Sequence, residues 1–98
     1  MIAKAFKFIL AQAKRMKYRL RIEVSLKPGH SDPEGETTAQ LLKELGYQIE
    51  TANVSKIYTV TLDAGSKKEA EAKGEEMCKR LLANPTKDNY AVTIEEKR

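Results

Sequence analysis

Apolar and polar side chains alternate near the start of the chain. The apolar members occupy every second position: Tyr18, Leu20, Ile22, Val24 and Leu26. Because a strand turns successive side chains to opposite faces, this period of two predicts a strand with one buried face. Weaker alternation predicts strands over 57–64 and 90–94, and the run 47–54 predicts a further strand paired with 57–64. The connection over 53–56 lacks the Asn-Gly signal of a tight hairpin.

A first helix is indicated between these strands. Thr38, Leu41, Leu42 and Leu45 have the spacing of one helix face, and we expect the helix to end at Gly46, a residue type that commonly stops helices. Residues three and four apart share one side of a helix, so these side chains predict an apolar stripe that packs on the sheet.

A second helix is expected to begin at Ser66, which has the spacing of a capping box with Glu69. Its apolar stripe includes Cys78, for which we expect the role of a small buried hydrophobe. The helix should end at Asn84, because Pro85 disfavours the helical conformation in the residue before it.

The elements follow one another in the order βαββαβ, the pattern of a ferredoxin-like α+β domain. In this two-layer arrangement, two helices cover one face of an antiparallel sheet. Three strand-forming threonines stand at positions of the other face, where a second sheet would bury them: Thr59, Thr61 and Thr93. Since symmetric pairing is the commonest way to cover such a surface, we expect a homodimer or homotetramer.

The segment 27–35, KPGHSDPEG, connects the first strand to the first helix. Pro28-Gly29 predicts a turn, since proline presets φ and glycine adopts conformations closed to other residues. Asp32 is the expected N-cap, with Pro33 at the first helical position. Gly35 stands in the first helical turns, where glycine costs about 1 kcal/mol relative to alanine. Its presence predicts the close approach of another backbone, from within the fold or from a partner subunit.

Charge is concentrated near the N-terminus. The chain has a net charge of +4, with 18 Lys and Arg against 14 Asp and Glu. Four basic residues and no acidic ones fall in residues 1–15, so residues 16–98 are balanced. Nucleic-acid binding needs clustered basic side chains, and this balance argues against it for residues 16–98. No apolar stretch reaches the roughly 18 residues of a membrane span, and the single cysteine fits a reducing cytoplasm.

Residues 1–15 form a basic extension that we separate from an α+β domain over 16–98. Its apolar residues have the spacing of an amphipathic helix: Ile2, Phe6, Ile9, Leu10 and Ala13. Such a helix suits a membrane surface, a targeting segment or a groove on a partner, although the apolar run is short for a secretory signal peptide. Because Met16 stands directly before the first strand, a dispensable extension is the preferred interpretation.

Catalytic chemistry finds little support in the sequence. His30 is the one histidine, and Asp32 and Glu34 lie near it, but no nucleophile completes a catalytic group. The same three residues make a weak metal site on a loop. The Gly29 turn matches neither the phosphate loop nor the dinucleotide-binding fingerprint. We expect no catalytic residue, cofactor or metal in this chain.

Three stretches stand out at fixed spacing: VSLKPGHSDPEG at 24–35, LGY at 45–47, and LLANP at 81–85 followed by Tyr90. Together with the βαββαβ order, they resemble the PurS family, the small subunit of phosphoribosylformylglycinamidine (FGAM) synthase. The resemblance covers residues 17–95. It departs at 53–56, where many members carry Arg and Gly around a retained Lys, and at Thr86 and Lys87, where apolar residues are usual.

The resemblance implies a place in the fourth step of de novo purine biosynthesis. There an ATP-dependent synthetase amidates formylglycinamide ribonucleotide with ammonia released from glutamine. In this family a glutaminase subunit, PurQ, makes the ammonia, and the synthetase subunit, PurL, carries ATP, Mg²⁺ and substrate. The small subunit is not the catalyst; its dimers are expected to bridge the other two and to assist ammonia transfer, in the cytoplasm.

Six residues are the expected contacts with partner subunits: Lys27, Gly29, Asp32, Gly35, Lys56 and Asn84. The alternative function is a free-standing ferredoxin-like regulatory module that binds a small metabolite between protomers. The two functions differ in a measurable way, because the alternative predicts no complex with glutaminase and synthetase subunits.

Overall fold

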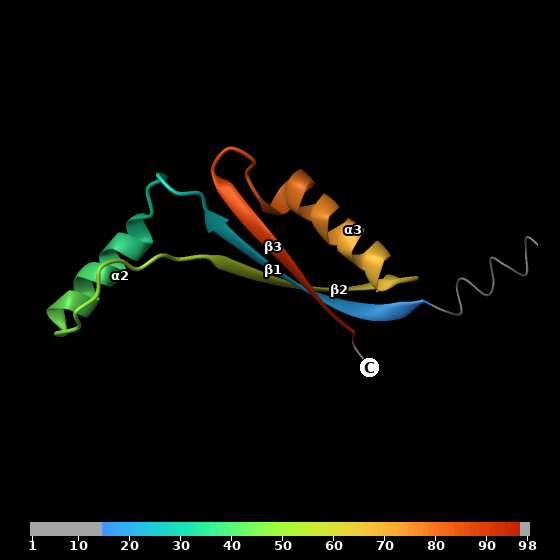
Figure 1. Ribbon diagram of the computed structural model, residues 1–98, viewed down its shortest axis with the longest axis horizontal. Coiled ribbons are helices and arrows are strands. Elements are labelled where there is room, and N and C mark those ends of the chain that lie inside the picture. The colour runs from blue at the N-terminus through green and yellow to red at the C-terminus, as the bar shows by residue number, and fades with distance from the viewer. Residues whose placement is uncertain (1–14, 97–98) are drawn as a thin grey trace, which may run out of the picture.

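The computed structural model describes residues 15–96 and places three strands in one antiparallel sheet (Figure 1). The strands are β1 (Met16–Leu26), β2 (Lys56–Ala64) and β3 (Asp88–Glu96), in the order β2-β1-β3. β1 is central, so that Leu20 lies opposite Val60 on one side and Ile94 on the other. Three of the four predicted strands are therefore confirmed, and the strand with the clearest alternation is the one that both neighbours pair with.

One face of this sheet is covered by α3 (Lys67–Met77) and the π-helical turn η1 (Cys78–Leu82) (Figure 1). The Ser66 side chain accepts a hydrogen bond from the Glu69 amide, as the capping-box spacing predicts. The Glu69 carboxylate, however, accepts from the amide of Gly65 instead of Ser66. The π turn carries the helical segment on to Leu82, close to its predicted end.

The core lies between α3 and the covered face of the sheet. The largest side chains with essentially no exposed surface are Leu20, Ile22 and Cys78. Gly74 allows α3 to come this close, because a Cβ there would stand 3.1 Å from Leu20 Cδ1 and 3.1 Å from Val92 Cγ1. The prediction of Cys78 as a core residue is confirmed.

Helix α2 (Pro33–Glu44) does not lie on the sheet, which corrects the prediction that two helices cover it. Figure 1 shows α2 at one end of the molecule, beyond the strand ends, while α3 lies along the sheet. Asp32 caps this helix and Gly46, at φ 98°, follows its last turn, both as predicted. The apolar stripe remains in solvent, since Leu41 and Leu45 are 55% and 75% exposed.

The strand predicted over 47–54 is also wrong. Residues 47–55 form no strand; they pass beside α2 and continue directly into β2 (Figure 1). A fourth strand would need the chain to reverse over 53–56, and this segment lacks the Asn-Gly signal of a tight hairpin. The α+β class and the antiparallel sheet are confirmed, but residues 33–54 form an arm that extends away from the sheet.

Close packing inside this arm explains Gly35. The glycine is buried, and a Cβ built on it would overlap the carbonyl oxygen of Ala52. Only glycine lets the backbone around Ala52 approach α2 this closely. Of the two origins considered for the close approach, the structure therefore shows the one within the fold.

Leu20→Ala tests the assignment of the core. We expect the free energy of unfolding to fall by about 3 kcal/mol, because the truncation leaves a cavity between α3 and the central strand. Urea denaturation followed by circular dichroism measures the loss. The control is Ile57→Ala, a truncation at a strand position that is 44% exposed, for which we expect a loss below about 1 kcal/mol. Equal losses would contradict the assignment.

Gly35→Ala tests the packing of the arm. Alanine is the better helix former by about 1 kcal/mol, yet we expect a net loss of about 1–2 kcal/mol because the added Cβ pushes the Ala52 backbone away. Hydrogen exchange should show faster exchange at the amides that the arm protects, Val54 among them. Gln40→Ala, at an exposed position of the same helix, should be neutral. A Gly35→Ala protein as stable as the original would show that the contact is not tight.

Candidate functional site

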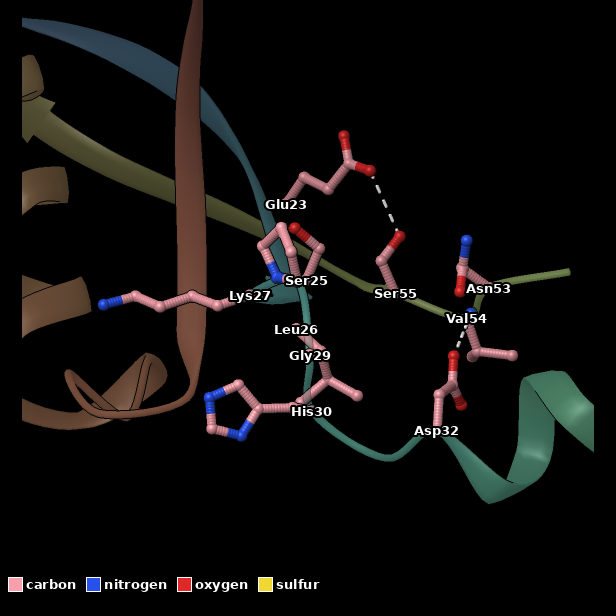
Figure 2. A pocket seen from close by; sticks show the side chains of 11 residues that line it. Glu23, Ser25, Leu26, Lys27, Gly29, His30, Asp32, Asn53, Val54 and Ser55 are labelled. Atoms are coloured by element: carbon pink, nitrogen blue, oxygen red, sulfur yellow. Dashed lines mark hydrogen bonds between the residues drawn. The ribbon is translucent and has the colours of Figure 1, made fainter. Parts of the chain in front are cut away.

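The residues expected to contact partners lie together where β1 ends and β2 begins. Lys27, Gly29 and Asp32 line a surface cavity of about 520 Å³ (Figure 2). A neighbouring cavity of about 240 Å³ is lined by Asp32, Lys56 and residues of the turn before β3. Asn84 lies in that same turn, beyond the cavity. The folded chain thus brings positions from four separate segments to one end of the sheet.

Asp32 fastens the arm at two points. One carboxylate oxygen, Oδ1, accepts a hydrogen bond from the Gly35 amide at 2.9 Å, and Oδ2 accepts one from the Val54 amide at 2.9 Å (Figure 2). The Val54 bond, and after it the Gly35 bond, hold the pKa of Asp32 below its usual value, because N–H donors favour the ionised carboxylate. The helix cap was predictable from the pair Asp32-Pro33. The bond to Val54 was not predictable, because every residue except proline has a backbone amide and the sequence does not show which distant amide will donate.

Lys27 and Asn84 both bond to the turn that precedes β3. The Lys27 side chain donates to the Pro85 carbonyl at 2.9 Å, and its amide donates to the Lys87 carbonyl at 2.7 Å. The Asn84 side-chain oxygen accepts from the Thr86 amide at 2.8 Å. These hydrogen bonds therefore hold the turn before β3 in place beside the end of β1.

The three residues considered as metal ligands do not converge. Figure 2 shows the His30 ring on the side of the cavity where Lys27 lies, whereas Asp32 points toward Val54. Within residues 15–96, no three His, Cys, Asp or Glu side chains are placed to hold a metal ion. On the cavity wall, Ser55 donates to Glu23 at 3.1 Å, a bond that the sequence did not signal. The lining therefore consists of charged and hydrogen-bonding side chains together with loop backbone.

A second polar contact joins the sheet to α3. The Tyr90 hydroxyl donates to Glu75 Oε2 at 2.8 Å, and this bond, aided by desolvation, raises the pKa of Tyr90. Burial raises the pKa of the nearby Cys78 thiol, and the charge of Glu75 adds to the effect. A buried thiol with a raised pKa is a poor nucleophile at neutral pH, so Cys78 has a packing role.

Asp32→Asn tests the bond to Val54 through pH. The pKa of Asp32 is lowered in the folded chain, so the ionised carboxylate adds stability above the ordinary carboxyl range, and this stability is lost as the pH falls through the folded pKa. We expect the variant to melt below the original protein at pH 7 and the two melting temperatures to converge as the pH falls through the lowered pKa of Asp32. Glu50→Gln, elsewhere in the arm, is the control. A difference that stays constant with pH would contradict the role of the charge.

The sequence of this chain matches a known protein family over most of its length. Residues 19–96 match the PurS family model, described as phosphoribosylformylglycinamidine (FGAM) synthase. The PurS subunit of FGAM synthase from Methanothermobacter thermautotrophicus is 37% identical over 81 residues, 83% of this chain and 96% of that protein.

Solved structures agree with this match. Thermus thermophilus PurS superposes with a TM-score of 0.78 at 34% identity, over 84% of this chain and 99% of that one. A chain in the structure of PurLQS from Thermotoga maritima superposes with a TM-score of 0.75 at 26% identity, over 81% of this chain and 98% of that one. These matches span the sheet, both helices and the arm, and the chain belongs to the PurS family of FGAM synthase subunits.

Proposed function

We propose that this chain is the non-catalytic small subunit of FGAM synthase. In this role it joins a glutaminase subunit, PurQ, to a synthetase subunit, PurL, and assists the transfer of ammonia between them. The observation that carries the proposal is the likeness to a chain of PurLQS, which extends over 81% of this chain.

The proposed partner surface is the end of the sheet that holds the two cavities. In this proposal a partner meets the turn with Lys27 and Gly29, the start of β2 at Lys56, and the turn with Asn84. Asp32 and Gly35 contribute by a different route, since their bonds and packing hold the arm in place beside these loops. Both lysines and carboxylates line this surface, which suits polar, salt-sensitive contacts of the kind that set orientation between subunits.

In this proposal the chain itself needs no cofactor, and ATP and Mg²⁺ are bound by the synthetase subunit. We place the assembly in the cytoplasm, with which the single buried cysteine agrees. Among the described residues, no helix is long and apolar enough to cross a membrane. We assign no nucleic-acid ligand, because the sheet tyrosines Tyr18, Tyr58 and Tyr90 face the core and leave no stacking platform.

We also propose that the subunit works as a homodimer or homotetramer. The exposed stripe of α2 supports this, because contiguous apolar side chains in solvent mark surfaces that another protein covers. Residues 1–15 lie outside the family match, and all of them except Arg15 lie outside the described residues; we propose that this extension is dispensable for bridging.

A free-standing regulatory module is the less favoured function. This alternative, in which a small metabolite binds between protomers, predicts no complex with glutaminase and synthetase subunits. The matches to proteins named as PurS subunits favour the bridging function over this alternative.

Reconstitution tests the bridging function. The full chain, mixed with the glutaminase and synthetase subunits in the presence of glutamine, ADP and Mg²⁺, should co-elute with both. Omitting the chain should abolish glutamine-dependent synthesis while synthesis from added ammonia continues. His30→Ala should leave turnover unchanged, because His30 has no catalytic partner. Failure to form a complex under any nucleotide condition would refute the proposal.

Lys56→Glu tests the proposed partner surface. We expect the affinity for the partner subunits to fall by at least about tenfold, as for the reversal of a charge within a polar interface. Lys67→Glu, the same reversal at the first residue of α3, is the matched control. Titration of labelled chain with the partner subunits at two salt concentrations measures both. Equal losses would place the partner surface elsewhere.

A further inference from the structure

Charged side chains of opposite sign line the smaller cavity at the end of the sheet. This cavity, of about 240 Å³, lies among the base of the arm, the end of β1, the start of β2 and the turn before β3. Glu34 lines it from the first turn of α2, Lys56 from the first residue of β2, and Lys87 from the turn. Within residues 15–96, none of these three side chains forms an ion pair. A carboxylate and two ammonium groups therefore share one cavity without being paired.

The other two carboxylates of this cavity are already engaged. Asp32 holds the two amides of the arm described above, and Asp88 Oδ2 accepts a hydrogen bond from the Asn84 amide at 2.9 Å. Among the residues that line the cavity, this leaves Glu34 as the carboxylate that the two lysines attract.

The turn before β3 and the start of β2 are the fixed side of the cavity. Lys27, directly after β1, donates to the carbonyls of Pro85 and Lys87. Because these bonds tie the turn to the central strand, the backbone that carries Lys87 stays with the sheet. Lys56 belongs to the sheet itself, since it lies opposite Val24 of β1.

The arm is the movable side of the cavity. The Asp32 carboxylate closes the arm at its base, so residues 28–31 and Ser55 are its connections to the sheet. Gly29 lies in the first connection at φ 90°, and a Cβ built on it would meet no atom within 4 Å, so this turn has open space around it. A side-chain bond spans the second connection, from Ser55 Oγ to Glu23 at 3.1 Å (Figure 2). Short connections of this kind absorb the backbone changes of a hinge, so the arm can turn about them as one body.

The two cavities at the end of the sheet meet at the base of the arm. The smaller one and the one of about 520 Å³ have five lining residues in common: Ser25, Leu26, Asp32, Val54 and Ser55. A turn of the arm that narrows the smaller cavity therefore changes the larger one as well. The position of the arm shapes the whole end of the sheet.

We propose that the arm closes on the smaller cavity and brings the Glu34 carboxylate to Lys56 and Lys87, the structure described here being the open state. Closure covers Lys56, which a partner meets in the proposed function; the inference rests on that function and specifies how its surface is regulated. Attraction between exposed charges favours closure by a small amount, and the bond of Ser55 to Glu23 favours the open arm. Both positions are therefore populated, and a partner that binds Lys56 shifts the population to the open one.

The first test measures the distance between the arm and the turn in the full chain. Spin labels are attached at Gln40→Cys and Thr86→Cys in a chain that also carries Cys78→Ala, diluted with unlabelled chain so that distances between copies do not contribute. Pulsed electron paramagnetic resonance should show two distances. We expect Glu34→Gln to remove the shorter one, because it removes the charge that the lysines attract, and Ser55→Ala to increase its share.

Glu36→Gln, two residues further along the same helix, is the matched control for this measurement. It should keep both distances, since Glu36 lines a different cavity. High salt should act like Glu34→Gln, because ions screen exposed charges. Circular dichroism checks that the labelled variants are folded. Distances that Glu34→Gln and salt leave unchanged, whether one or two, would overturn the inference.

The second test measures binding of the full chain to the partner subunits. Glu34→Gln should lower the dissociation constant about two- to fivefold, because it removes the closed arm that competes with the partner for Lys56. Glu36→Gln should leave the constant unchanged. Equal constants for Glu34→Gln and the original chain, in complexes that form normally, would overturn the regulation and leave the bridging function standing. Failure of the original chain to bind would refute the bridging function, and the distances would still decide whether the arm closes.

Discussion

The two hydrogen bonds of the Asp32 carboxylate are the interaction on which the rest of the structure depends. One bond starts α2, and the other attaches the chain 22 residues later to the same side chain. Because both acceptors belong to one carboxylate, the direction of the helix and the course of the segment that follows it are set together. This is why α2 stands beyond the strand ends, why the loops around Lys27 and Lys56 face a common cavity, and why the apolar stripe of α2 is left open.

Much of the fold follows from local patterns in the sequence. The alternation from Tyr18 to Leu26 indicates the central strand, and Asp32, Gly46 and Ser66 mark helix ends through side-chain and glycine chemistry that acts within four residues. The errors concern 47–54 and the placement of α2. The alternation of apolar and polar residues distinguishes the two faces of a strand but does not identify the strand that pairs with it. An apolar stripe on a helix likewise does not identify the surface that the helix packs on.

In the candidate site, too, the local features were predictable from the sequence and the long-range contacts were not. Asp32, Gly35 and the turn at Gly29 were recognisable because each residue type has a backbone role there. Val54, Ser55 and Glu23 were not, because their contacts join residues distant in sequence through groups that every chain carries. Glycine lowers the stability of a helix, so its presence at position 35 predicted that another backbone comes close. Only the folded chain identifies that backbone as the one at Ala52.

The exposed stripe of α2 has a thermodynamic consequence for the cell. If folding of the arm is completed only by a second copy, the stability of the chain includes a mass-action component and rises with its own concentration. A subunit made in too small an amount would then be less stable as well as less abundant. Balanced synthesis with its partners would protect it from proteolysis, since every partner that binds only the folded form draws the equilibrium further from the unfolded chain.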